Sequence, residues 1–454
     1  MNLVSSLKLL TLNKVFQNSL WGIISSLFQN IVFSVFFIVL ARKLDTSVLS
    51  SYIISNTFYG LMLSFSSLGM GQWFVRKLVN DSKNIKYINL FISVQLCSGI
   101  IFYFIQTLIV VNLYEEKIIH QISYILGFNI IFDNILYVAK TINVINNDQR
   151  KTFIITSSEA LMKLIFAYFI WLYGTSILFI VFTLVLLRLI SVVLFLQYGL
   201  PEDIIIRFRS IIYSFRFSEL VETVYSNKYF ILIGSLSVLF WSYGNIIVSK
   251  LIGLSYVPHF EISYKLFTMA ELVPLVFSAS IFPVLTQKYK SDYNGLVIYF
   301  RKIFWIYAAY GFLSFMFILF FADLFIPTLF GVGYIGTSKY SVQLFFTMLL
   351  FPTSLLQANL LIAMGYERRD MWYNLFMLIS HIIISLTLLS FFQDLTYLNL
   401  SIFLSFLIFH LSQDFFLLKK QILTKYDVLL FYAMIIIFTV LFRFGSLLPF
   451  RNSL

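Results

Sequence analysis

The stretch that decides the fold of this chain is SILFIVFTLVLLRLISVVLFLQY, residues 176–198. Arg188 is its only charged residue. A helix needs about 20 predominantly apolar residues to cross the hydrocarbon core of a bilayer, so this stretch is long enough to span a membrane. Comparable apolar runs recur from Trp21 almost to Phe450. We therefore predict an all-α, polytopic membrane protein with about 12–13 transmembrane helices.

The composition of the chain supports this prediction. Only 11% of the 454 residues are charged, and 60% are hydrophobic. A soluble domain carries about 25% charged residues, so this chain lacks the polar surface that water requires. The formal net charge of +12 suits nucleic-acid binding or a membrane protein with basic cytoplasmic loops, and we favour the second. The four histidines lie far apart, and the chain has no glycine-rich phosphate loop or nucleophile elbow, so we expect no metal, no cofactor and no enzymatic activity.

Hydropathy windows of about 19 residues place the helices along the chain. The predicted spans cover residues 17–41, 47–70, 87–113, 118–142, 152–173, 176–198, 228–250, 258–285, 302–326, 340–364, 371–392 and 396–418. A further apolar segment, 428–448, either spans the membrane or lies at its surface. With the N-terminus in the cytoplasm, the lysines and arginines divide about three to one between inner and outer loops. We therefore expect a multi-pass protein of the cell inner (plasma) membrane with a cytoplasmic N-terminus.

Two features suggest a chain of two halves. The longest polar connection, Pro201–Asn227, follows six predicted helices on the inner side. The end of the first helix, Ala41–Asp45, is similar to the end of the seventh, Ser249–Gly253, as expected for a parallel repeat. The predicted parts are an N-terminal six-helix lobe (1–200), a cytoplasmic linker (201–227), a C-terminal six-helix lobe (228–420) and a hydrophobic C-terminal segment (421–454).

Short motifs near the ends of the predicted helices carry a family resemblance. In the first half they are Ala41-Arg42-Lys43-Leu44-Asp45, Tyr52, and Ser67-Leu68-Gly69-Met70-Gly71 followed by Val75-Arg76. In the second half they are Tyr264-Lys265-Leu266, Ile281-Phe282-Pro283-Val284-Leu285 and Asn359-Leu360-Leu361-Ile362-Ala363-Met364-Gly365. In this order the chain resembles the polysaccharide transporter family of the multidrug/oligosaccharidyl-lipid/polysaccharide exporter superfamily, which includes the O-antigen and capsule repeat-unit flippases.

The resemblance implies two six-helix lobes around a central cavity that opens alternately to the two sides of the membrane. The implied substrate is an undecaprenyl-pyrophosphate-linked oligosaccharide, flipped from the cytoplasmic to the periplasmic leaflet. The implied partners are membrane lipid and the polymerase and chain-length proteins of the same pathway. Two positions depart from the family pattern, because Asp45 replaces a glycine and Asn245 replaces an aspartate. A seventh-helix carboxylate is therefore not expected to act in this chain.

Charged residues inside the predicted spans are candidate functional residues, since charge is costly to bury in a bilayer. A flippase must hold a pyrophosphate away from water, and a cation of the protein has to meet it. The candidates for substrate binding are Arg188, Lys163 and Lys265. Lys163 follows Glu159 by four residues and Lys265 follows Glu261 by four, so each pair shares a helix face. Each pair is either functional or a structural salt bridge.

Arg188 has no acidic neighbour in its own predicted helix. It either contacts the pyrophosphate or forms an interhelical tie to Asp133 or Glu159, and we favour substrate contact. Helices five and six are joined by a short turn, which should bring Lys163 and Arg188 to a similar depth. We expect loss of charge to impair function more at Arg188 than at Lys163.

The candidates for ion coupling are Glu271, Asp133 and Glu159. Glu271 is a lone carboxylate near the centre of a span, and Pro274 three residues later suggests a kink that exposes it. It either takes up a proton or is hydrogen-bonded to a neighbouring helix. His381 and His410 are also titratable, but a lone membrane histidine is more often a hydrogen-bonded packing residue.

Two other functions compete with a flippase. An ion-coupled multidrug exporter of the same superfamily would carry amphipathic cations and would be centred on acidic residues, which Lys163, Arg188 and Lys265 disfavour. A membrane-embedded polysaccharide polymerase or ligase would need a large periplasmic loop with arginine or histidine. The predicted outer loops are short, which disfavours this enzyme.

Overall fold

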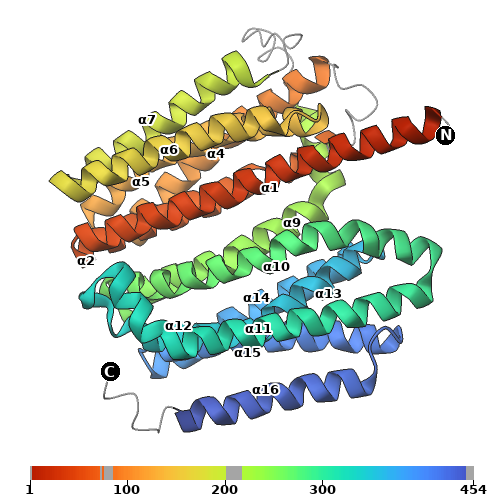
Figure 1. Cartoon of the computed structure of the whole chain (residues 1–454). Coiled ribbons are helices and arrows are strands. Elements are labelled where there is room, and N and C mark those ends of the chain that lie inside the picture. Colours follow the sequence, from red (N-terminus) through yellow and green to blue (C-terminus); the bar gives the residue numbers. More distant parts are fainter. Residues whose placement is uncertain (1–2, 72–73, 76–84, 201–216, 446–454) are drawn as a thin grey trace. The chain divides into compact units, whose positions relative to one another are not determined.

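The computed structural model describes residues 3–71, 74–75, 85–200 and 217–445, and the elements in these ranges are helices (Figure 1). The longer helices of the first half are α1 (Leu3–Lys43), α2 (Thr46–Ser66), α4 (Ile85–Leu113), α5 (Lys117–Ile145), α6 (Gln149–Tyr173), α7 (Ile177–Leu194) and α9 (Phe217–Ile247). Those of the second half are α10 (Val257–Ser291), α11 (Tyr293–Phe330), α12 (Thr337–Phe345), α13 (Phe351–Ala363), α14 (Glu367–Phe391), α15 (Leu395–Lys419) and α16 (Lys425–Gly445).

Within the described residues, 12 helical segments are long and apolar enough to cross a membrane. They correspond in order to the twelve predicted spans, and α12 and α13 together form one of them, Thr337–Ala363. The prediction of an all-α, polytopic membrane protein is confirmed. The segment 428–448 falls largely in α16, and its crossing of the membrane stays a prediction.

Helices α10 and α11 both extend into the loop that was predicted between residues 285 and 302. Lys288 and Lys290 lie in the last turn of α10, where positive charge is favourable at the C-terminal end of a helix. Asp292 separates the two helices, and its Oδ1 accepts a hydrogen bond of 2.8 Å from the backbone N–H of Gly295 in the first turn of α11. The polar stretch that was expected to form a loop therefore continues both helices.

The chain divides into two compact units. Unit 1 contains Met1–Lys265 and Phe325–Thr337, and unit 2 contains Leu266–Leu324 and Ser338–Leu454. Helices α10 and α11 each contribute to both units. The lobe boundaries at residues 200 and 228 stay a prediction, and residues 201–216 of the predicted linker lie outside the described residues.

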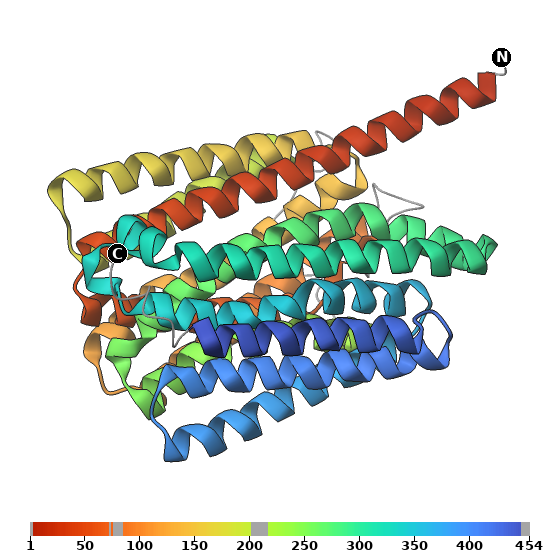
Figure 2. The same ribbon diagram turned by 60° about the horizontal axis from the view of Figure 1, so that its bottom comes forward.

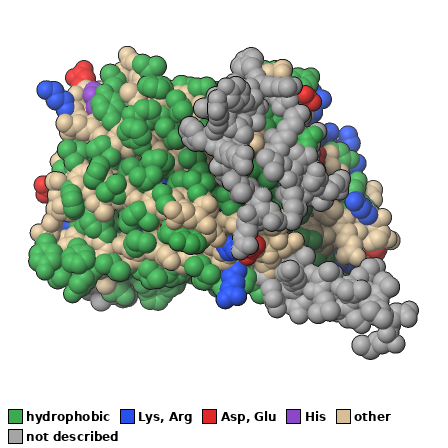
Figure 3. Space-filling view, turned by 90° about the horizontal axis from the view of Figure 1, so that it is seen from above, with side chains coloured by type: hydrophobic (Ala, Val, Ile, Leu, Met, Phe, Trp, Pro, Cys, Tyr) green, Lys and Arg blue, Asp and Glu red, His purple; other side chains and the backbone are tan. Residues whose placement is uncertain are grey.

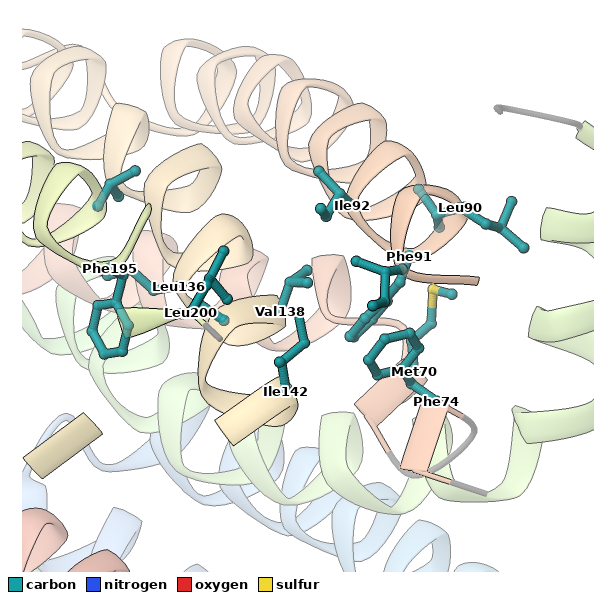
Figure 4. Close-up of a cluster of buried hydrophobic side chains, with 14 of the residues drawn as sticks. Met70, Phe74, Leu90, Phe91, Ile92, Leu136, Val138, Ile142, Phe195 and Leu200 are labelled. Atoms are coloured by element: carbon teal, nitrogen blue, oxygen red, sulfur yellow. The ribbon is translucent and has the colours of Figure 1, made fainter. Parts of the chain in front are cut away.

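In unit 1, α5 packs against α2, α4 and α7, and α1 lies along α6 (Figures 1 and 2). A cluster of buried apolar side chains joins α4, α5 and the turn after α7 (Figure 4). It includes Phe74, Phe91, Leu136 and Phe195, and the ring centroids of Phe74 and Phe91 are 4.2 Å apart. Burying a side chain of this size stabilises the fold by about 1.5–3 kcal/mol. This packing holds together α5 and α7, which carry most of the charge described below.

The Ser67–Gly71 motif has a structural explanation. Leu68 and Gly69 have φ angles of 50° and 57°, in the left-handed region, and end the second helix with a tight turn. The backbone N–H of Gly71 donates a 2.7 Å hydrogen bond to Oη of Tyr137 on α5. A Cβ atom at Gly71 would lie only 2.2 Å from that oxygen, so this close approach requires glycine.

Large apolar side chains stay exposed on the outer helices of unit 1. Ile165 and Phe169 on α6 are 58% and 51% exposed, and Phe182 on α7 is 51% exposed. The space-filling view has a broad area of hydrophobic side chains, with charged side chains toward its borders (Figure 3). Such surfaces suit contact with lipid.

In unit 2, α14 packs along α15, and both contact α13. Helix α16 lies beside α15 (Figures 1 and 2).

Candidate functional site

Unit 1 encloses a group of charged side chains among α5, α6 and α7. We call it the charge cluster, and it comprises Asp133 and Lys140 from α5, Glu159 and Lys163 from α6, and Arg188 from α7. Five charged side chains inside a helical membrane bundle are costly to bury, so their arrangement has to account for the charge of each.

Arg188 bridges the two carboxylates. Its Nε lies 3.0 Å from Oδ1 of Asp133, and its Nη1 lies 3.0 Å from Oε2 of Glu159. Of the two alternatives left open from the sequence, the interhelical ion pair is present, and it involves both Asp133 and Glu159. Both partners lie on other helices, so spacing along α7 cannot reveal them. Its role in substrate binding stays a proposal.

Glu159 is the most buried member of the charge cluster, with 4% of its side chain exposed. Its Oε1 lies 2.6 Å from Nζ of Lys163, one turn later on α6, as the spacing predicted. The hydroxyl of Ser191 donates a 2.7 Å hydrogen bond to its Oε2. Asp133 accepts a hydrogen bond from the hydroxyl of Tyr59 on α2. Both carboxylates are thus fixed by donors from neighbouring helices.

Lys140 is the member of the charge cluster that the sequence did not reveal. It follows Asp133 by seven residues, or about two turns, so both lie on one face of α5. Its ammonium interacts electrostatically with all four other charges of the cluster. Among the residues that the structure describes, no carboxylate forms an ion pair with it. From the sequence, Lys140 was counted only as a topology-setting cation at a helix end.

The charge cluster therefore contains three basic side chains against two carboxylates. When Lys140 is protonated, the cluster carries one positive charge that no carboxylate at ion-pair distance offsets within the described residues. A partly buried ammonium without a counter-ion is costly, so the site favours the arrival of an anion. Arg188 and Lys163 are 19% and 20% exposed, so the cluster is accessible at its cationic side.

Lys265, the third predicted substrate cation, lies in a separate group of unit 1. Its Nζ is 3.2 Å from Oε1 of Glu261 and 4.7 Å from the ring centroid of Phe33. Asn245, which stands where the family has an aspartate, donates a 2.8 Å hydrogen bond to Glu261. The ion pair expected from the spacing is present, and the charges of this pair balance each other.

Glu271 lies in the part of α10 that belongs to unit 2. No hydrogen bond or ion pair engages its carboxylate within the described ranges. Pro274 has no N–H to donate to the carbonyl of Ala270, and the hydroxyl of Tyr310 on α11 donates to that carbonyl instead, at 2.6 Å. The helix is thus loosened beside Glu271 and tied to α11. Glu271 therefore belongs to a different unit from Asp133 and Glu159, the other coupling candidates.

Comparison with solved structures gives the fold. An inward-facing multidrug resistance MATE family transporter of the MOP superfamily superposes with a TM-score of 0.71 at 14% identity, covering 87% of this chain and 94% of the other. An outward-facing structure of such a transporter gives 0.62 at 14% identity, covering 90% and 95%. A MOP superfamily transporter from Pyrococcus furiosus Vc1 (DSM3638), described as having a binding pocket of reverse polarity, gives 0.60 at 13% identity, covering 88% and 95%.

Comparison of the sequence gives the family. No curated protein matches the chain significantly. A family profile described as "Polysaccharide biosynthesis protein" matches residues 39–339, which is more than half of the chain. The resemblance drawn from the helix-end motifs is thereby confirmed, and the chain, a multi-pass membrane protein with the fold of MOP-superfamily transporters, belongs to the polysaccharide biosynthesis protein family.

Proposed function

We propose that the protein is a flippase that moves undecaprenyl-pyrophosphate-linked oligosaccharide repeat units from the cytoplasmic to the periplasmic leaflet by alternating access. Family and fold support a membrane transporter that acts in polysaccharide biosynthesis. The observation that carries the proposal further is the unbalanced positive charge of the charge cluster in unit 1.

The cluster suits a pyrophosphate for electrostatic reasons. Asp133 and Glu159 hold Arg188 between them, so that the guanidinium is oriented before substrate arrives. Lys140 supplies the charge that no carboxylate offsets, and an ammonium binds phosphate oxygens as a point charge. The lipid tail stays in the bilayer, so the protein has to receive only the pyrophosphate and the sugars. In this proposal Lys140 makes the main ionic contact, and Arg188 and Lys163 add to the field around it.

The same observation disfavours the multidrug exporter. An exporter of amphipathic cations needs a site with an excess of negative charge, and the charge cluster has the opposite sign. The pair of Lys265 with Glu261 adds no net charge of either sign. A polymerase or ligase is disfavoured because the connections are short. For example, α6 ends at Tyr173 and α7 begins at Ile177.

For coupling, Glu271 suits the role better than Asp133 and Glu159. The latter two are ion-paired with Arg188 or Lys163, whereas Glu271 has no such partner among the described residues. We propose that Glu271 takes up a proton during the transport cycle. We also keep the cytoplasmic N-terminus, the inner membrane, and the polymerase and chain-length partners as parts of this proposal.

The proposal can be tested by complementation of a strain that lacks its own repeat-unit flippase. Lys140→Gln should abolish surface polysaccharide and cause the lipid-linked glycan to accumulate, and Lys140→Arg should restore part of the activity. Lys151→Gln is the matched control, because Lys151 pairs with Asp148 at 3.1 Å on the surface and is 38% exposed. All variants should be present in the membrane in equal amounts. Full activity of Lys140→Gln, or no accumulated glycan when the gene itself is deleted from its own genome, would contradict the proposal.

A further inference from the structure

Unit 2 buries a histidine and an aspartate on successive turns of α15. Nδ1 of His410 lies 2.8 Å from Oδ2 of Asp414, and the two side chains are 0% and 3% exposed. We call this pair and its hydrogen-bond partners Thr353, Gln357 and Tyr432 the His–Asp network. The partners come from α13 and α16, so the network joins three helices of unit 2.

The carboxylate of Asp414 is surrounded by donors. The hydroxyl of Tyr432 on α16 donates to its Oδ2 at 2.8 Å, and Nε2 of Gln357 on α13 donates to its Oδ1 at 2.8 Å. The imidazole Nδ1–H of His410 is a third donor. A carboxylate with three such donors is well stabilised in its charged form.

At its other ring nitrogen the imidazole meets the hydroxyl of Thr353, which can both donate and accept, and Nε2 of Gln357 lies 3.4 Å from the same nitrogen. Nε2 of His410 lies 2.9 Å from Oγ1 of Thr353, and that oxygen also lies 2.9 Å from the carbonyl oxygen of Leu350. When His410 is neutral, its Nε2 accepts the hydrogen of the Thr353 hydroxyl. When His410 is doubly protonated, its Nε2–H donates to Thr353, whose hydroxyl turns to donate to Leu350.

Rotation of its hydroxyl alone therefore lets Thr353 serve both protonation states. In the first state the pair carries one negative charge, on Asp414. Transfer of one proton from a hydronium ion to Nε2 of His410 releases a water molecule and leaves an imidazolium beside a carboxylate, with no net charge. Because an unbalanced charge is costly inside a membrane protein, addition of a single proton relieves that cost.

We propose that His410 and Asp414 form a proton-binding site, in addition to the flippase function and to Glu271. The ligand is a proton and not a metal ion, because a hard cation needs several free oxygen ligands and the oxygens of Asp414 are occupied by donors. The ring of Phe431 stacks on His410 with centroids 4.8 Å apart, and Phe304 of α11 lies 6.4 Å away. These rings enclose the imidazole on its remaining sides. Within the described residues, the groups that meet the pair from α11, α13 and α16 carry no further charge. Helix α14, which also packs along α15, carries the buried Asp370, whose Oδ2 accepts a 3.2 Å hydrogen bond from Nδ2 of Asn374 on the same helix.

The start of α16 offers a route to water. Asp427 is five residues before Tyr432, which corresponds to about 7.5 Å along the helix. It lies 3.6 Å from Arg301, which is 33% exposed, and its side chain accepts hydrogen bonds from Thr424 at the turn between α15 and α16. The His–Asp network thus lies about one and a half helical turns from a polar, accessible end of the unit, the end that the distribution of cations predicts to be cytoplasmic.

Nuclear magnetic resonance of the full-length protein in lipid nanodiscs, with ¹⁵N-labelled histidine, tests the proposal directly. The ¹⁵N shifts distinguish a neutral imidazole from an imidazolium, and His410→Asn identifies the His410 signal. As the pH is lowered from about 8 to about 5, the His410 signal should convert reversibly to the imidazolium form. In Asp414→Asn the same conversion should require a proton concentration at least about tenfold higher, because the negative charge that favours the imidazolium is gone.

Tyr432→Phe gives a second test, in which the conversion of His410 should shift in the opposite direction. This variant keeps both His410 and Asp414, so it remains informative if Asp414→Asn fails to fold. In this variant the carboxylate of Asp414 loses one hydrogen-bond donor, so His410 should become protonated at a lower proton concentration than in the unsubstituted protein. His381, which is buried and hydrogen-bonded to Ser401 at 3.0 Å, is the internal control and should keep its signal in both variants.

A His410 ring that stays neutral at every pH, or a conversion that neither substitution shifts, would overturn the proposal. Suppression of the conversion by sodium ions would overturn it in favour of a cation site. The measurement needs no substrate, so a negative result here leaves the flippase proposal standing.

Discussion

The charge cluster of unit 1 and the His–Asp network of unit 2 both fix buried carboxylates, but they do so by different means. In the charge cluster, Asp133 and Glu159 form ion pairs with Arg188 and Lys163, and Lys140 has no carboxylate at ion-pair distance among the described residues. In the His–Asp network, Asp414 is held by hydroxyl, amide and imidazole donors, and the charge of the group depends on one proton. The first arrangement suits binding of an anion, and the second suits exchange of a proton.

Removal of Arg188 should have the largest effect on the charge cluster. Arg188→Ala leaves Asp133 without a cation at ion-pair distance and removes one of the two cations that pair with Glu159. Breaking a buried ion pair costs about 3–5 kcal/mol. We expect a large loss of folded protein, measured as thermal stability in detergent. Lys163→Ala should be milder, because Glu159 keeps Arg188 and Ser191. Equal stability of Arg188→Ala and the unsubstituted protein would contradict this account of the cluster.

Two tyrosines provide a matched pair for the comparison. Tyr59 donates to Asp133 in the charge cluster, and Tyr432 donates to Asp414 in the His–Asp network. A hydrogen bond to a charged group contributes about 1.5–3 kcal/mol, so either Tyr→Phe substitution should lower stability by a similar amount. Only Tyr432→Phe should change the pH dependence of complementation, because Asp133 remains paired with Arg188. A shifted pH profile for Tyr59→Phe would break the distinction between the two sites.

Asp394 belongs to neither site and tests the stability of unit 2 alone. Its Oδ1 accepts a 2.7 Å hydrogen bond from the backbone N–H of Thr396 and caps α15, so Asp394→Ala should cost about 1 kcal/mol. Burial alone would raise the pKa of Asp394, but the hydrogen bonds from Thr396 outweigh it and hold the pKa below its usual value.

The sign of the pH effect follows from that lowered pKa. The cap stabilises the fold above the pKa of the unfolded chain, about 3.9, and the contribution is lost as the pH falls through the folded value. The difference in unfolding temperature between Asp394→Ala and the unsubstituted protein should therefore be present at pH 7 and shrink in acid. A difference that persists unchanged at low pH would argue against the cap.

Glu271→Gln should have the smallest effect on stability, because no described residue is bonded to that carboxylate. It should nevertheless reduce flipping and flatten its pH dependence if Glu271 takes up a proton. Complementation measured across pH, with membrane protein levels as the control, distinguishes Glu271 from His410. Unchanged complementation at every pH would remove Glu271 from the coupling mechanism.

Hydropathy predicted the membrane spans well, since an apolar run of sufficient length has few alternatives to a transmembrane helix. It missed the extensions of α10 and α11, because charged residues such as Lys288 and Lys290 are stable in a terminal helical turn. Pairs on one helix were also predictable, and Glu159 with Lys163 and Glu261 with Lys265 both form.

Contacts between helices were not predictable from spacing. The partners of Arg188 lie on α5 and α6, and a single sequence does not tell which faces of separate helices meet. Two signals were nevertheless available. Lys140 follows Asp133 by about two turns, and Asp414 follows His410 by one, so each pair could have been placed on a common helix face before the structure was known.

The most direct test of the central claim is the affinity of the purified protein for undecaprenyl pyrophosphate in nanodiscs of neutral lipid at fixed salt. A charged hydrogen bond worth about 1.5 kcal/mol or more corresponds to at least about tenfold in Kd. Lys140→Gln should raise Kd by at least that factor, Lys140→Arg should raise it less, and Lys151→Gln should leave it unchanged. Equal Kd values for folded Lys140→Gln and the unsubstituted protein would contradict the claim that the unbalanced charge of unit 1 receives the pyrophosphate.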